Sequence, residues 1–224
     1  MTKVYLSGSE SINNEIKEFL SGKAEFTQNP EEAGIIFNTT NYPEYEKSEE
    51  LQYIESVTPD TIPIFTSSLC VSVSEQCRLQ PNPARLIGIG LYDTFSKAKR
   101  IEIAPSKITD AAILKNAENF LSEAGVNYSV VPDRVGLIFP RIVSMIINEA
   151  AQVYSEQIAS KEDIDTAMKL GTNYPFGPLE WADRLGVELV YNILAALQRD
   201  FGEDRYRPHP LLKEMANLNK RFYD

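Results

Sequence analysis

The spacing of apolar positions divides the chain into two parts with different patterns. Up to about residue 132, short runs rich in β-branched residues recur, and helical stretches separate several of them. This alternation is typical of an α/β domain with parallel strands. The expected strands are KVYLS (3–7), GIIFNT (34–39), TIPIFTS (61–67), RLIGIGLY (85–92), RIEIAP (100–105) and NYSVVP (127–132), and the expected helices include INNEIKEFL, EYEKSEELQYI and DAAILKNAENFLSEAG.

The remaining part of the chain shows helical periodicity alone. In LIFPRIVSMIINEAAQVYSEQ, apolar residues follow the i, i+3, i+4, i+7 spacing of one buried helix face. The next segment, SKEDIDTAMKLG, begins with Ser160 and Asp163 in a capping-box arrangement and is expected to end at Gly171. We therefore expect a sheet domain at 1–132 and an all-helical domain at 133–224.

Composition and charge restrict the class of partner. The 224 residues carry a formal net charge of -10, which argues against nucleic acid or an anionic membrane as partner, because both require clustered Lys and Arg. Neither a signal peptide nor a membrane-spanning window is evident, so we expect a cytoplasmic protein. Cys70 and Cys77 lack the paired spacing of a zinc site, and we expect no metal.

The most specific motif lies in the helical part. ASKEDIDTAMKLGTNYPFGPLEWADRLG (159–186) resembles the C-terminal domain of the 3-hydroxyacyl-CoA dehydrogenase family, where a helix beginning SKEDID precedes a YP-GP-E turn. GLIFPR and RYRPHPLLKEM are similar to two further segments of that domain, and IFTSSL, RLIGIGLYDT and KRIEI resemble the family's serine, histidine and glutamate strands. The resemblance implies a truncated Rossmann-like sheet domain, followed by an all-α domain that forms a homodimer through its helices.

The same resemblance assigns the catalytic positions. Ser67 matches the family's serine and Glu102 its glutamate, but Gly90 stands where the family has the histidine that accepts the substrate's proton. Pro140 stands at the family's asparagine and lacks any side-chain hydrogen-bonding group. General base catalysis, worth roughly 10²- to 10⁴-fold, is therefore unavailable at Gly90. The resemblance implies a catalytic strand without its base.

Other interpretations exist for several of these residues. Ser67 could be the N-cap of the following helix, and Glu102 a strand residue paired with Lys99 or Arg100. The only histidine, His209, lies far along the chain in the RPHPLL turn and is expected at the surface. Asp93 and Glu102 could in principle replace the missing base, since burial can raise the pKa of a carboxyl group into a useful range.

The N-terminus bears on the dinucleotide site that a dehydrogenase needs. A Rossmann fingerprint requires G-x-G-x-x-G between the first strand and its helix. Here only Gly8 remains, and Glu10 and Asn13 occupy the other two glycine positions. The strand that would contact the adenine ribose is expected to be deleted, because the chain passes almost directly to AEFTQNPEEAGIIF. We therefore expect no cofactor.

Two functions remain open. One is an inactive or impaired relative of the dehydrogenases that binds acyl-CoA or a partner enzyme of fatty-acid metabolism as a dimer. Lys47 aligns with a family lysine near the CoA phosphates, although a solvated lysine is the simpler interpretation. The other is an NAD-dependent dehydrogenase with altered chemistry based on Ser67, Asp93 and Glu102. In that case a partner chain could supply the missing half of the nucleotide site.

Overall fold

A mixed sheet forms the centre of the first part of the chain. Within the residues that the computed structural model describes, 1–98 and 100–223, seven strands hydrogen-bond in the order β2-β1-β3-β4-β5-β6-β7. They are β1 (Lys3–Ser7), β2 (Glu25–Thr27), β3 (Ile35–Asn38), β4 (Ile64–Ser67), β5 (Leu86–Ile89), β6 (Ile101–Pro105) and β7 (Tyr128–Val130).

Neighbouring strands are parallel except for β5 and β6, which run antiparallel. The expectation of parallel strands is therefore wrong for this pair. Among residues 90–98 and 100, which the structure describes between β5 and β6, the only helical segment is a short 3-10 turn at Phe95–Lys97, and a parallel crossover usually needs an α-helix. As a result, the start of β6 lies at the same sheet edge as the end of β5.

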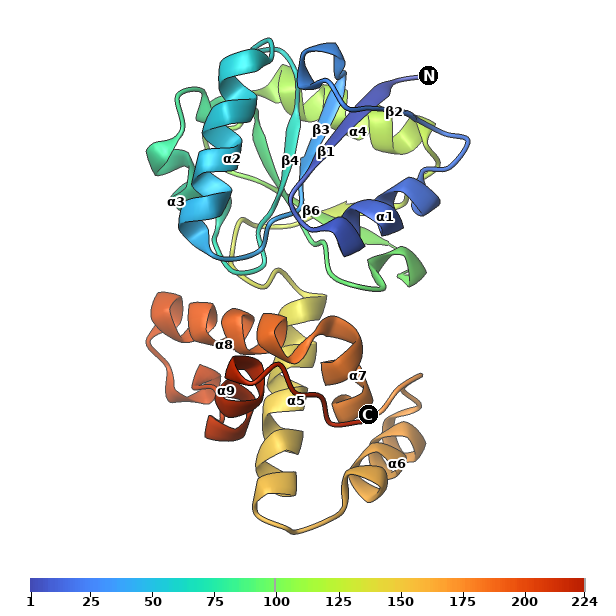
Figure 1. Ribbon diagram of the computed structural model, residues 1–224, viewed down its shortest axis with the longest axis vertical. Helices are drawn as coiled ribbons and strands as arrows, with labels where there is room; N and C mark the ends of the chain where they lie inside the picture. Colours follow the sequence, from blue (N-terminus) through green and yellow to red (C-terminus); the bar gives the residue numbers. More distant parts are fainter. Residues whose placement is uncertain (99, 224) are drawn as a thin grey trace. The chain divides into compact units, whose positions relative to one another are not determined.

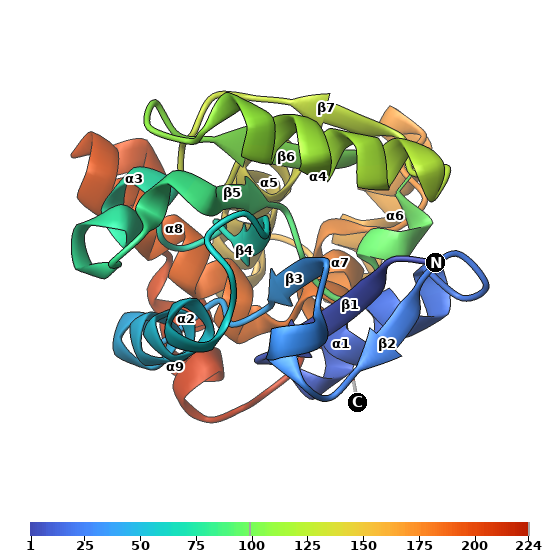
Figure 2. The ribbon, with the colours of Figure 1, turned by 90° about the horizontal axis from the view of Figure 1, so that it is seen from above.

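Helices cover both faces of this sheet, with α2 and α4 on opposite sides (Figures 1 and 2). Phe120 of α4 packs edge-to-face on Phe37 of β3, and Ile16 of α1 lines the same apolar layer. On the other face, Leu51 and Ile54 of α2 join a buried cluster with Ile36 and its strand neighbours. The helices are α1 (Glu10–Phe19), α2 (Glu44–Val57), α3 (Val73–Gln76) and α4 (Ala111–Glu123).

The edge strand β2 corrects the expectation that the second strand of the nucleotide half is deleted. It pairs in parallel with β1, with Thr27 opposite Tyr5. Because β1 continues to Ser7, β2 ends two positions before the end of its neighbour. The residues directly after it, Gln28 and Asn29, carry no carboxylate. The strand exists, but it is too short to bring an acidic side chain level with the end of β1.

The chain divides into two units, Met1–Leu137 and Ile138–Asp224. The division falls after residue 137 rather than after the expected residue 132. Asp133 accepts hydrogen bonds from the backbone N–H groups of Val73 and Ser74, both at 2.8 Å, at the start of α3. The N–H of Gly136 donates to the carbonyl of Leu69 at 2.8 Å. These bonds hold the connecting segment to the sheet unit.

The second unit is all-helical, and its central helix α5 contacts each of the others (Figure 1). Ser160 caps α6 through the N–H of Asp163 at 3.1 Å, as the sequence predicted. The helix passes through Gly171, and Asn173 takes the left-handed conformation expected of the glycine. The helices are α5 (Phe139–Ser155), α6 (Lys161–Thr172), α7 (Pro178–Leu185), α8 (Val187–Phe201) and α9 (Pro210–Asn217).

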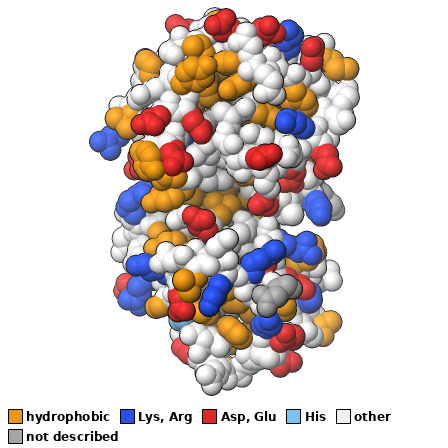
Figure 3. All heavy atoms as spheres, in the orientation of Figure 1, with side chains coloured by type: hydrophobic (Ala, Val, Ile, Leu, Met, Phe, Trp, Pro, Cys, Tyr) orange, Lys and Arg blue, Asp and Glu red, His pale blue; other side chains and the backbone are white. Residues whose placement is uncertain are grey.

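In the described ranges, none of the helices is both long and apolar enough to cross a bilayer. On the face drawn in Figure 3, acidic and basic side chains are interspersed with hydrophobic ones.

Candidate functional site

The ends of β4 and β5 and the start of β6 meet at one edge of the sheet. Ser67, the last residue of β4, pairs with Ile89 of β5. Gly90 follows β5 directly, and its N–H donates to the carbonyl of Glu102 at 3.0 Å. The backbone therefore places Ser67, Gly90 and Glu102 side by side at the carboxyl edge, where open α/β sheets bind ligands.

Leu137 covers the position where a side chain at residue 90 would project. A Cβ atom built on Gly90 would lie 3.1 Å from Cδ1 of Leu137, which is closer than ordinary van der Waals contact. Leu137 is buried and has a φ of +50°, a backbone conformation that few non-glycine residues adopt. The space beside Gly90 is thus filled by an aliphatic side chain of the same unit.

The hydroxyl of Ser67 is engaged by an asparagine that the sequence analysis did not identify. Ser67 Oγ donates to Oδ1 of Asn41, in the loop between β3 and α2. Nδ2 of Asn41 in turn donates to the carbonyl of Leu91 at 3.3 Å. Ser67 is not the N-cap of the following helix, because Ser72 holds that role through the N–H of Glu75. Ser67 is therefore part of a polar bridge across the carboxyl edge.

Glu102 lies close to a buried phenol. Burial, followed by the negative charges of Glu102 and Glu15, raises the pKa of Tyr92. Arg100, one of the two expected partners of Glu102, instead donates to the carbonyl of Tyr128 at 3.1 Å and to the Ser129 hydroxyl at 3.2 Å. The other expected partner, Lys99, lies outside the described residues.

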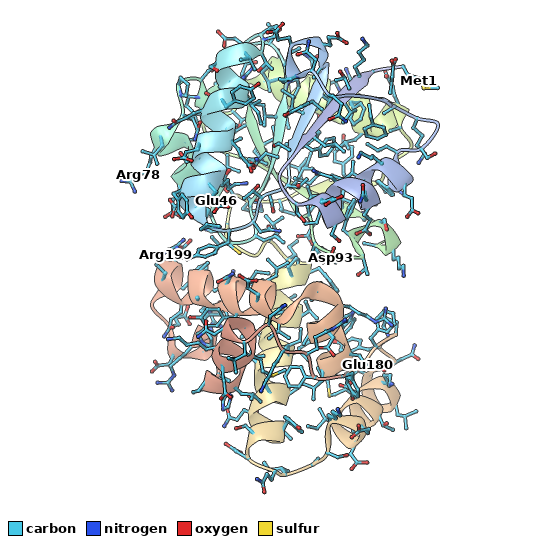
Figure 4. The ribbon with its side chains drawn as sticks, viewed as in Figure 1. Met1, Glu46, Arg78, Asp93, Glu180 and Arg199 are labelled. Atoms are coloured by element: carbon cyan, nitrogen blue, oxygen red, sulfur yellow. The ribbon has the colours of Figure 1, made fainter. Side chains whose placement is uncertain are left out.

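Asp93, labelled in Figure 4, follows β5 and is hydrogen-bonded to α1. Its Oδ1 accepts the hydroxyl of Ser11 at 2.6 Å. Glu15 of α1 holds the same loop by accepting the N–H groups of Thr94 at 2.8 Å and Ser96 at 2.9 Å. The hypothesis of altered chemistry relied on Ser67, Asp93 and Glu102, and the structure gives each a different partner. Ser67 bonds to Asn41, Asp93 bonds to Ser11, and Glu102 lies near Tyr92.

The turn between β1 and α1 is closely packed around Gly8. This glycine has a φ of +92°, and a Cβ there would lie 2.5 Å from the hydroxyl oxygen and 2.6 Å from the backbone nitrogen of Thr40. Asn13, at the third glycine position of the fingerprint, accepts the Thr39 hydroxyl at 2.9 Å. Glu10, at the second position, is the first residue of α1 and is exposed.

Lys47 is buried, so the interpretation as a solvated lysine is wrong. The residue is 1% exposed, and its Nζ donates to Asn38 Oδ1 and to the Thr40 carbonyl, both at 2.8 Å. Burial lowers its pKa from 10.5 to about 7, and the nearby carboxylate of Glu50 opposes that shift. Glu50 accepts from Asn38 Nδ2 at 2.5 Å and from the Thr40 hydroxyl at 2.7 Å. The ammonium group is enclosed by this network.

The second unit holds the remaining predicted residues. Pro140 is buried as the second residue of α5, a position that suits proline because its nitrogen would have no partner within the helix. His209 caps α9, and its Nδ1 accepts the N–H of Leu211 at 3.2 Å. Trp181 is half-buried and contacts the rings of Phe139, Tyr174 and Phe176, whereas Leu179 is fully buried.

The YPFGPLEW turn is held by a buried carboxylate. Asp165 of α6 accepts the N–H groups of Leu179 at 2.8 Å and Glu180 at 3.0 Å, and the hydroxyl of Tyr223 at 2.9 Å. Asp183 accepts the N–H groups of Phe222 and Tyr223. The C-terminal segment therefore packs on α6 and α7 of its own chain. The described part of the chain contains no cluster of three or more His, Cys, Asp or Glu suited to a metal ion.

Two contributors to the sheet edge, Asn41 and Glu15, could not be identified from the motifs. Asn41 could have been noticed as a polar residue soon after a buried strand, at the edge where parallel strands end. Glu15 is one of several acidic residues on an amphipathic helix, and the sequence contains no signal that connects it with a loop about eighty residues away.

Comparisons with known proteins agree with this fold. A family model described as the C-terminal domain of 3-hydroxyacyl-CoA dehydrogenase matches residues 136–221. The 3-hydroxyadipyl-CoA dehydrogenase of Escherichia coli K12 is 39% identical over 124 residues, 55% of this chain and 26% of that protein. The 3-hydroxybutyryl-CoA dehydrogenase of Clostridioides difficile is 33% identical over 165 residues, 72% of this chain and 57% of that protein. The chain thus spans less than two thirds of the length of either relative.

A solved structure extends the likeness over both units. The (S)-3-hydroxybutyryl-CoA dehydrogenase PaaH1 from Ralstonia eutropha superposes with a TM-score of 0.79 at 19% identity, and the match covers 98% of this chain and 94% of that one. At this identity the likeness concerns the fold, which is Rossmann-like in the sheet unit. The family model and the sequence relatives show that the chain belongs to the 3-hydroxyacyl-CoA dehydrogenase family.

Proposed function

We propose that this chain is a cytoplasmic 3-hydroxyacyl-CoA dehydrogenase-like protein that does not transfer hydride, and that it binds an acyl-CoA or a partner of fatty-acid metabolism as a homodimer. The observation that carries the proposal is the Gly90 position, which offers no base and is covered by Leu137. The only histidine of the chain, His209, belongs to the other unit and is occupied as a helix cap. Loss of the base removes a factor of roughly 10² to 10⁴ in rate.

The turn between β1 and α1 supports the second part of the proposal, that NAD is not bound. A dinucleotide places its pyrophosphate on the N-terminus of this helix, where free N–H groups and the helix dipole favour negative charge. Here Glu10 begins the helix, and the Ser11 hydroxyl holds the carboxylate of Asp93 beside its first turn. Two carboxylates at this end repel a pyrophosphate. The residues present therefore do not fit the cofactor.

Dimer formation is supported by apolar side chains on the helical unit. Ile158 is 67% exposed and Leu170 is 82% exposed. Burial of these two apolar side chains in an interface would stabilise a dimer. Sedimentation velocity of the full chain tests this proposal. A monomer at micromolar concentration would contradict it.

The alternative function is an NAD-dependent oxidoreductase of 3-hydroxyacyl-CoA or acetoacetyl-CoA with altered catalytic residues. In its favour, Ser67 and Glu102 lie on either side of Gly90 at the edge of the sheet. Against it, the carboxylate of Asp93 is hydrogen-bonded to Ser11 of α1. This alternative also requires that NAD binds despite Glu10, or that a partner chain completes the nucleotide site.

Titration with NADH, followed by an assay of NADH oxidation with acetoacetyl-CoA, separates the two functions. We expect no saturable NADH fluorescence change in the micromolar range and no turnover. The controls are Glu102→Ala, which removes the remaining acidic group beside Gly90, and Glu123→Ala, which removes an exposed glutamate at the end of α4. Turnover that disappears in Glu102→Ala but persists in Glu123→Ala would establish the dehydrogenase and exclude our proposal.

A further inference from the structure

The bridge between Asn41 and Ser67 fixes the direction of each hydrogen bond within it. The Leu91 carbonyl can only accept, so the atom of Asn41 that faces it at 3.3 Å must be the donor Nδ2. This orientation turns Oδ1 of Asn41 toward Ser67, and Oδ1 can only accept. The single hydroxyl hydrogen of Ser67 is therefore committed to Asn41.

A serine hydroxyl has one hydrogen to donate and two lone pairs that accept. Among residues 1–98 and 100–223, Asn41 is the only hydrogen-bond partner of the Ser67 hydroxyl. The lone pairs of Ser67 Oγ remain available to a ligand, whereas its hydrogen is already donated to Asn41. In this arrangement Ser67 can bind a group that donates a hydrogen bond, whereas a carbonyl oxygen brought to the same place would face lone pairs.

The surroundings make this difference matter. Ser67 is 1% exposed, so water does not easily screen a mismatch of two acceptors. Asn41 is only half-buried, which places the bridge at the accessible margin of the edge. The amide that bonds to Ser67 belongs to the loop after β3, within the same unit.

We propose that Asn41 is a specificity-determining residue that makes Ser67 an obligate acceptor, so that the site prefers a 3-hydroxyacyl thioester, whose hydroxyl donates, over the corresponding 3-oxoacyl thioester. This inference rests on the proposed binding of acyl-CoA. It concerns ligand selection alone and does not require hydride transfer. Asn41 acts through Ser67 and is a positioning residue.

Calorimetric titration of the full chain with (S)-3-hydroxybutyryl-CoA, acetoacetyl-CoA and CoA tests the inference. We expect the hydroxy ester to bind about tenfold more tightly than the keto ester, since one hydrogen bond is exchanged for an acceptor–acceptor contact. Asn41→Ala releases the Ser67 hydrogen and should bring the ratio of the two dissociation constants to about one or below. Binding of CoA alone should not change.

Two further variants keep the test decisive. Ser67→Ala removes both the donor and the acceptor and should abolish the preference even if Asn41→Ala does not fold. Asn116→Ala, at an exposed position of α4, should retain the wild-type ratio. Equal affinities of the wild type for the two esters, or a preference for the keto ester, would overturn this inference and leave the proposed acyl-CoA binding intact. No binding of either ester would overturn both.

Discussion

Replacing Lys47 by methionine should change how the stability of the protein depends on pH. The folded-state pKa of Lys47 is about 7, whereas the ordinary value is 10.5. Between these values the unfolded chain binds a proton that the folded chain does not, so stability rises with pH across this window. At about 1.4 kcal/mol per pKa unit, the difference amounts to about 5 kcal/mol below pH 7 and disappears above pH 10.5.

The assay is urea unfolding of the wild type and Lys47→Met at pH 7, 8, 9 and 10. We expect the stability of the wild type relative to the variant to increase by about 3 to 4 kcal/mol over this range. The variant also loses the bonds from Nζ to Asn38 and Thr40, but that loss is a constant offset and does not alter the slope. Lys115→Met, at an exposed position of α4, serves as the control and should follow the wild type.

The comparison isolates Lys47 because the wild type and Lys47→Met share every other titratable group. If wild type and Lys47→Met give parallel curves, the ammonium group is not held in a low-dielectric environment. In that case the reasoning from its burial is refuted, whatever the absolute stabilities are.

Substitutions at three further positions test the packing, a helix cap and a buried carboxylate. Gly8→Ala should lower the free energy of unfolding by about 2 kcal/mol or more, because the Cβ of the alanine would overlap Thr40 and the backbone at this position has a positive φ. A thermal midpoint equal to that of the wild type would contradict this expectation. His209→Ala should lower the free energy of unfolding by about 1 kcal/mol through loss of the α9 cap, whereas His209→Asn, which can still cap the helix, should lower it much less. Equal losses of stability in the two variants would exclude a capping role. Asp165→Ala should destabilise the helical unit by about 3 kcal/mol, because three hydrogen-bond donors, including the Tyr223 hydroxyl, lose a buried carboxylate. Far-UV circular dichroism during urea unfolding measures the effect. An unchanged midpoint would show that the turn is held by packing alone.

Much of the fold could be predicted from the sequence because its signals are local. The runs of β-branched residues that indicated strands contain β1, β3, β4, β5, β6 and β7. The edge strand β2 was not predicted because three residues, EFT, are too few to show an alternating pattern. The end of α6 differed by a few residues, since Asn173 can adopt the left-handed conformation and Gly171 was not needed for it.

The candidate site was only partly predictable, because its contacts join distant segments. The order of the strands places Ser67 beside Gly90, and the motifs were sufficient to anticipate that. The bridge from Asn41 and the packing of Leu137 depend on loops whose conformations leave no periodic signal. Burial of Lys47 was also hidden, because a lysine in a charged segment is normally solvated and its partners belong to the preceding strand and loop.

The packing of Leu137 against Gly90 has a consequence for protein engineering. A histidine introduced at residue 90 alone would have its Cβ 3.1 Å from Cδ1 of Leu137. Such a variant would be overpacked, and overpacking typically costs about 1 to 3 kcal/mol of the small stability margin of a domain. A larger residue at position 90 would therefore need a smaller one at position 137. The two positions constrain each other, so an engineered histidine at residue 90 should be introduced together with a substitution of Leu137.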